Sequence, residues 1–96
     1  MLRTILITGA SSGIGAATAI AFANPNNRLI LVSRKNREGL KKIEDEGRER
    51  GAEVLSILAD VSDYESCKSL LTEANEHFGP IDLLINNARS EEHTSE

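Results

Sequence analysis

A glycine-rich segment near the amino terminus has the residue types and spacing to bind a phosphate group. It reads Thr8-Gly9-Ala10-Ser11-Ser12-Gly13-Ile14-Gly15. Glycines at these spacings let a backbone turn tightly and approach a pyrophosphate, whose charge is favourable at a helix N-terminus. The spacing is neither Gly-x-Gly-x-x-Gly nor a P-loop, because a P-loop needs Gly-Lys-Ser/Thr where this chain has Gly13-Ile14. The structural alternative is a helix-capping turn that is merely rich in glycine.

The elements that must position this turn alternate between apolar runs and amphipathic segments. Short apolar runs predict strands at 4–8, 29–32, 53–59 and 81–86. The segments between them predict helices at 12–24 and 37–50, and a third that opens with a capping box of Ser62 and Glu65. The apolar faces expected for the first and third helices contain Ile14, Thr18, Ala21, Phe22, and Cys67, Leu70, Leu71, Ala74, Phe78. The order β-α-β-α-β-α-β favours a parallel sheet with right-handed crossovers.

Composition excludes several classes of protein. The chain has 96 residues, 40% of them hydrophobic and 27% charged, with a net charge of -4 in which acidic and basic residues are interleaved. This balance predicts a globular domain that binds neither nucleic acid nor membrane. Its longest apolar runs, of about five residues, are far below the roughly 18 needed to cross a bilayer. No leader is visible before Thr4, and the single cysteine, Cys67, suits a reducing compartment, so we expect a cytoplasmic protein.

The last eight residues, 89–96, do not continue the pattern of strands and helices. They read Arg-Ser-Glu-Glu-His-Thr-Ser-Glu, without a large apolar side chain. A solvated, disordered tail is one interpretation. The octapeptide also looks like the translation of a common sequencing adapter, so we expect a non-native tail and leave it out of the fold.

Three motifs together resemble the short-chain dehydrogenase/reductase family: the segment 8–15, Asp60-Val61 and Asn86-Asn87-Ala88. They occur in the order and at the intervals of that family, over residues 1–88. The resemblance implies an α/β fold, a truncated Rossmann-like doubly wound parallel sheet with strand order 3-2-1-4, in which 1–88 is the N-terminal half of an NAD(P)-binding domain. It further implies an oxidoreductase that moves hydride between a nicotinamide dinucleotide and a small carbonyl or alcohol substrate. The family's usual homo-oligomer is implied too, although the sequence has no signal for it.

The resemblance also assigns roles to individual residues. Around the pyrophosphate it places Gly9, Ser11, Ser12, Gly13, Ile14 and Gly15. Asp60 would accept a hydrogen bond from the adenine amino group, and the Val61 amide would meet the adenine ring. Asn87 and Ala88 would line the two riboses. Asn86 is expected to tie the fourth strand to its neighbours. The alternative for Asp60 is that it simply ends a strand.

The end of the second strand bears on the choice of cofactor. NAD-binding members carry an acid there for the ribose 2′-hydroxyl, whereas NADP-binding members use an arginine. This chain has Ser33-Arg34-Lys35-Asn36-Arg37, without an acid. A guanidinium can grip a 2′-phosphate through a bidentate fork, so Arg34 predicts NADP, with NAD less favoured. The alternative is a solvated basic turn, which we expect for Lys35 and Arg37.

The family's catalytic Ser, Tyr and Lys follow a fifth strand and are not found in 1–96, so the fragment is expected to be inactive. Tyr64 and Lys68 match the family's Tyr-x-x-x-Lys spacing, but they open a helix, and we expect a surface pair away from the ligand-binding end of the strands. Arg89, where the family has glycine, would crowd the cofactor. No metal site is expected. A non-catalytic dinucleotide-binding module is the alternative function.

Overall fold

The computed structural model describes residues 2–87. Ala88 and the tail 89–96 lie outside the described residues, so the predictions for them are not addressed by the fold. The strands are β1 (Arg3–Thr8), β2 (Asn27–Ser33), β3 (Glu53–Leu58) and β4 (Leu83–Asn86), and the helices are α1 (Gly13–Phe22), α2 (Arg37–Glu49) and α3 (Tyr64–Phe78). Strands and helices therefore alternate as expected.

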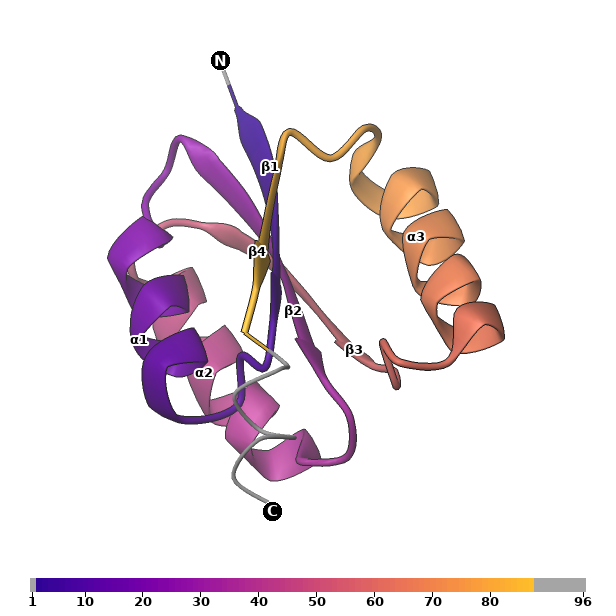
Figure 1. The fold of residues 1–96 in the computed structure, drawn as a ribbon. Coiled ribbons are helices and arrows are strands. Elements are labelled where there is room, and N and C mark those ends of the chain that lie inside the picture. Colours follow the sequence, from indigo (N-terminus) through magenta and orange to yellow (C-terminus); the bar gives the residue numbers. More distant parts are fainter. Residues whose placement is uncertain (1, 88–96) are drawn as a thin grey trace.

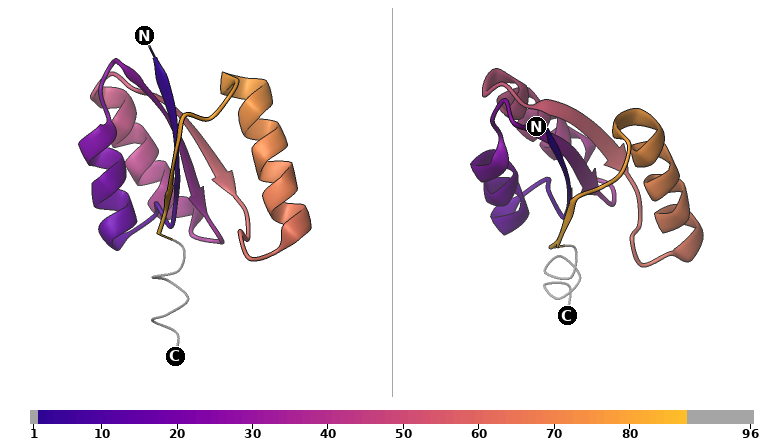
Figure 2. Two further views of the ribbon diagram at one scale, coloured as in Figure 1. Left: turned by 45° about the horizontal axis from the view of Figure 1, so that its top comes forward. Right: turned by 90° about the horizontal axis from the view of Figure 1, so that it is seen from above.

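The four strands form one parallel sheet in the order β3-β2-β1-β4, which confirms the predicted fold class (Figure 1). Ile5 of β1 lies beside Leu29 of β2 and Leu83 of β4. Helices α1 and α2 cover one face of the sheet and α3 covers the other (Figure 2). Each helix follows the carboxyl end of a strand, so the three helix N-termini lie at one end of the sheet.

Alternate residues of the central strands divide the core into two layers. Ile5 and Ile7 of β1 face α1 and α2, where they pack with Ala19 and Leu40. Leu6 of β1 faces the other way and packs in the layer that α3 completes. Because β1 and β2 are covered on both faces, their apolar runs are continuous.

The helix faces differ from the sequence-based expectation at three residues that are exposed, which are Ile14 and Ala21 of α1 and Leu71 of α3. In α1, Ile14 is 70% exposed, and the helix packs instead through Gly15 and Ala19. Small residues let the helix backbone approach the sheet, whereas periodicity had favoured the larger side chains. In α3, Leu71 is 46% exposed while Leu70 and Ala74 are buried.

The start of α3 also differs from the prediction. Asp63, not Ser62, is the N-cap, and its carboxylate accepts a 2.9 Å hydrogen bond from the Ser66 amide. The Ser62 hydroxyl instead donates to Asp60. Both residue types are good caps and they are adjacent, so the pattern alone could not choose between them.

Among the described helices, none is long and apolar enough to span a membrane.

Candidate functional site

The glycine-rich turn connects β1 to α1 at the carboxyl ends of the strands (Figure 1). Gly9 and Gly13 have φ values of 63° and 59°, in the left-handed region that favours glycine. Gly15 has ordinary dihedrals, but a Cβ there would overlap the carbonyl of Gly9. Each of these glycines is therefore required by the shape of the turn, two by conformation and one by close approach.

The N-terminus of α1 lacks the side-chain cap that the other two described helices have. Asn36 and Asp63 cap α2 and α3 through their side chains, and each of those helices has a glutamate in its first turn. Within the described residues, α1 has neither a side-chain cap from Ser12 nor an acid in its first turn. Its first amides and the positive end of its dipole are thus left for an external anion.

Two buried serines join the glycine-rich turn to the end of β2. The Ser33 hydroxyl donates a 3.1 Å hydrogen bond to the hydroxyl of Ser11, and both residues are buried. The backbone amide of Ala10 donates to the carbonyl of Val32 at 3.0 Å. The turn is therefore attached to β2 by a backbone and a side-chain hydrogen bond.

Arg34 and Asp60 follow the neighbouring strands β2 and β3, and Arg34 is exposed. Asp60 accepts hydrogen bonds from the hydroxyl of Ser62 at 2.6 Å and from its amide at 3.0 Å. These bonds, together with a smaller attraction to the Arg34 charge, lower the pKa of Asp60, while partial desolvation acts in the opposite direction. The Asp60 carboxylate is thus held ionised with its orientation fixed, close enough to Arg34 for the two charges to interact.

The end of β4 is tied to β1 through Thr8. The Thr8 hydroxyl donates to Asn86 Oδ1 at 2.6 Å and accepts from the Asn87 amide at 2.9 Å. This contact between β1 and β4 confirms the role expected for Asn86. The side-chain Nδ2 of Asn87 is buried and has no hydrogen-bond partner among residues 2–87. Within the described chain it is a buried donor without an acceptor, and it lies next to the strand that leads into the glycine-rich turn.

The predicted site residues are therefore gathered at one end of the sheet. The turn 9–15, Arg34, Asp60 and Asn87 all follow carboxyl ends of strands, and Val61 packs partly buried beside the α3 layer. Ligands of open α/β sheets bind at this end. The Ile14 side chain is 70% exposed, so only the backbone of this residue forms part of the turn.

The family profile described as short chain dehydrogenase matches residues 3–95 of the sequence. The chain belongs to the short-chain dehydrogenase family. Versicolorin reductase from Emericella nidulans is 37% identical over 86 residues, which make up 90% of this chain and 33% of that protein. The chain thus spans about a third of the length of this curated relative.

Solved structures of short-chain dehydrogenases share the fold. L-sorbose reductase from Gluconobacter frateurii, complexed with NADPH and L-sorbose, is 33% identical with a TM-score of 0.82, over 90% of this chain and 33% of that one. An NAD+-bound xylitol dehydrogenase is 36% identical with a TM-score of 0.80, over 85% of this chain and 31% of that one. Both cofactors therefore occur among the structural neighbours, and the choice between them depends on the residues of this chain.

The residues of this short-chain dehydrogenase fit a dinucleotide. The first turn of α1 lacks an internal anion, the space around Gly13 is open, and Asn87 holds a buried donor without a partner in the described chain. A diphosphate matches the uncapped amides, and ribose oxygens match an amide donor. The arrangement thus fits a diphosphate and a ribose hydroxyl, two groups that a dinucleotide contains.

Sequence reasoning missed two polar residues of the site, Thr8 and Ser33. Each is the last residue of a strand, is 3% exposed, and holds a neighbouring segment through its hydroxyl. The signal was present, because each is a hydroxyl side chain that ends an otherwise apolar run. A buried polar group in such a position needs a partner.

Tyr64 lies at the ligand-binding end of the sheet, contrary to the expectation that it lies away from it. It is the first residue of α3, and α3 follows the carboxyl end of β3. Its side chain is 74% exposed, and the described contacts include none between Tyr64 and Lys68 that would organise an acid–base pair. Surface exposure, rather than distance from this end, argues against a catalytic role.

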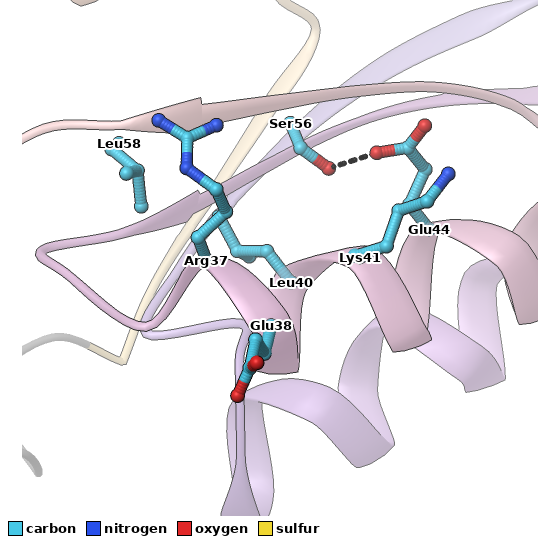
Figure 3. Close-up of a pocket in the computed structure, with 7 residues that line it drawn as sticks. All are labelled: Arg37, Glu38, Leu40, Lys41, Glu44, Ser56 and Leu58. Atoms are coloured by element: carbon cyan, nitrogen blue, oxygen red, sulfur yellow. Dashed lines mark hydrogen bonds between the residues drawn. The ribbon is translucent and has the colours of Figure 1, made fainter.

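A hollow of about 540 Å³ lies between α2 and the outer edge of β3 (Figure 3). Arg37, Lys41 and Leu58 are among the residues that line it, and none of the predicted cofactor-binding residues does. Within it, the Ser56 hydroxyl donates to the Glu44 carboxylate at 2.8 Å, which attaches α2 to β3. This hollow is a packing feature beside the candidate site and is separate from it.

Proposed function

We propose that residues 1–88 are the cofactor-binding half of an NADP-dependent short-chain oxidoreductase that acts on a carbonyl or alcohol substrate. The bound nicotinamide would supply the hydride acceptor or donor. The observation that carries the proposal is the position of Arg34, exposed directly after β2, where no acid is present. NADP and NAD differ by a 2′-phosphate, which a carboxylate at this place would repel and a guanidinium attracts.

The proposed contacts follow the geometry of the site. The turn Gly9–Gly15 and the N-terminus of α1 would hold the diphosphate through backbone amides, with Ser12 exposed toward solvent and Ser11 buried beneath the turn. Asp60, ionised and oriented by Ser62, would accept a hydrogen bond from the adenine amino group, and the amide of Val61 would meet the ring. Asn87 would donate to a ribose oxygen, and Asn87 and Ala88 together would line the two riboses.

Arg34 is better placed for the phosphate than the other two basic residues of this segment. It follows Ser33 directly and is near enough to Asp60 to lower the pKa of that carboxyl. Arg37 is the first residue of α2 and lines the hollow between α2 and β3. Lys35 is exposed, and a lysine lacks the planar fork that matches phosphate.

Cytoplasmic location is part of the proposal, supported by the free, half-buried Cys67.

The test is the substitution Arg34→Glu, with Lys35→Glu as the matched control for the same change of charge. Because charge-assisted hydrogen bonds contribute about 1.5–3 kcal/mol, we expect Arg34→Glu to weaken NADPH binding about 10- to 100-fold and to leave NADH binding unchanged or improved. Lys35→Glu should have a smaller effect that added salt removes. Titration calorimetry of the full-length protein measures both. Equal loss of both cofactors would refute the phosphate assignment.

A further inference from the structure

The hydroxyl of Ser33 joins the two segments that a bound dinucleotide would touch. Ser33 is the last residue of β2 and is 3% exposed. Its Oγ donates to Ser11 Oγ at 3.1 Å and accepts from the Asn36 amide at 3.3 Å. Its carbonyl accepts from the Ala59 amide at 3.0 Å. One side chain thus contacts the glycine-rich turn and the connection from β2 to α2.

That connection consists of Arg34, Lys35 and Asn36, and it is fixed at both ends. The Asn36 amide donates a hydrogen bond to the Ser33 hydroxyl and so closes the connection. The Asn36 side chain caps α2 by accepting a hydrogen bond from the Gly39 amide at 3.0 Å. Arg34 and Lys35 between them are exposed. The backbone that carries the Arg34 guanidinium is therefore held by neighbours that are themselves hydrogen-bonded, while the guanidinium reaches solvent.

The first turn of α2 also packs directly on the glycine-rich turn. A Cβ at Gly39 would lie 2.7 Å from the carbonyl oxygen of Ser11 and 2.5 Å from Asn36 Nδ2. Only glycine fits there without movement. Ser11, Ser33, Asn36 and Gly39, which we call the Ser33 network, therefore form one closely packed unit between the turn and α2.

We propose that Ser33 is a positioning residue for cofactor specificity. The inference rests on the proposed NADP preference and adds to it. A 2′-phosphate is recognised only if Arg34 lies at a fixed separation from the turn that holds the diphosphate, since both groups belong to one ligand. The Ser33 network sets that separation. NAD lacks the 2′-phosphate, so its binding does not depend on the separation between Arg34 and the glycine-rich turn.

The experiment measures NADPH and NADH affinities for Ser33→Ala, Arg34→Ala and the double variant in the full-length protein. Ser56→Ala is the matched control, because Ser56 is also a strand serine with a side-chain hydrogen bond, to Glu44 at 2.8 Å. We expect Ser33→Ala to weaken NADPH binding about fivefold, in line with the loss of an ordinary hydrogen bond, and to leave NADH within about twofold. Ser56→Ala should leave the NADPH-to-NADH ratio unchanged. On the Arg34→Ala background, Ser33→Ala should have no further effect on the ratio.

A second measurement does not depend on which cofactor binds. Amide hydrogen exchange of the free protein should show faster exchange at Asn36 in Ser33→Ala than in the unmodified protein. Unchanged exchange at Asn36, or equal weakening of NADPH and NADH by Ser33→Ala, overturns the positioning role while the effect of Arg34→Ala remains. If Arg34→Ala itself leaves the ratio unchanged, the proposed NADP preference fails, and the specificity role of Ser33 fails with it.

Discussion

The hydroxyl of Thr8 lies 2.6 Å from Asn86 Oδ1 and accepts a 2.9 Å hydrogen bond from the amide of Asn87. Thr8 precedes the glycine-rich turn, and Asn87 follows β4. One buried side chain therefore holds together two segments that are 79 positions apart in the sequence. The turn and the proposed ribose contact share this support.

We expect Thr8→Val to destabilise the protein by about 1–3 kcal/mol, because the replacement removes a buried hydroxyl that makes two hydrogen bonds between β1 and the end of β4. Thr72→Val is the control, since the Thr72 hydroxyl bonds to the Lys68 carbonyl at 3.0 Å on an exposed surface. Its effect should stay within about 0.5 kcal/mol. Urea denaturation measures both free energies of unfolding. Equal effects of the two substitutions would show that the Thr8 contact has no special importance.

Gly15→Ala should disturb the glycine-rich turn more than Gly13→Asn. An alanine Cβ at 15 overlaps the carbonyl of Gly9, so the backbone must shift, at a cost of about 1–3 kcal/mol. Gly13 has a φ of 59° with open space around it, and asparagine tolerates this conformation for less than about 1 kcal/mol. Thermal unfolding of the two variants measures the difference. If Gly13→Asn lowers the unfolding temperature more than Gly15→Ala does, the close approach of residue 15 to the Gly9 carbonyl is not what requires glycine there.

The strands and their parallel pairing were predictable from the residues, whereas the strand order came from the resemblance to the family. Continuous apolar runs such as 29–32 predict buried strands, and the helical segments between them impose parallel pairing. The packing of α1 was not predictable from periodicity, because Gly15 and Ala19 pack through their small size. Thr8 and Ser33 were missed for a different reason. Their partners are distant in sequence, and only the tertiary fold brings them together.

Ser62→Ala should raise the pKa of Asp60 toward its ordinary value, because it removes the hydroxyl that donates to the carboxylate at 2.6 Å. A lowered folded-state pKa stabilises the protein above the unfolded-state pKa, and this stabilisation is lost as the pH falls through the folded-state pKa. Ser62→Ala should therefore lower the free energy of unfolding at neutral pH, and the difference from the unmodified protein should disappear in strong acid. Carbon-13 NMR titration of the Asp60 carboxyl measures the shift, with the exposed Ser69→Ala as control. An unchanged titration would contradict the assignment.

Leu84→Lys should reduce self-association of the 96-residue chain. Leu84 is 60% exposed on β4, and within residues 2–87 this strand pairs with β1 alone. Its neighbours Leu83 and Ile85 are half-buried against the core, so Leu84 is the exposed apolar side chain of this edge strand within the described residues. A lysine on an edge strand opposes pairing with another chain. Sedimentation velocity measures association, and Ile85→Lys should instead unfold the protein. Unchanged association of Leu84→Lys would exclude β4 as the contact surface.

The measurement that tests the central claim most directly is the ratio of NADH to NADPH dissociation constants of the unmodified full-length protein. The position of Arg34, exposed directly after β2 with no acid in the connection to α2, predicts that NADPH binds at least about tenfold more tightly than NADH. Added salt should reduce this preference, because much of it is electrostatic. Equal affinities, or tighter binding of NADH, would contradict the proposed recognition of the 2′-phosphate by Arg34.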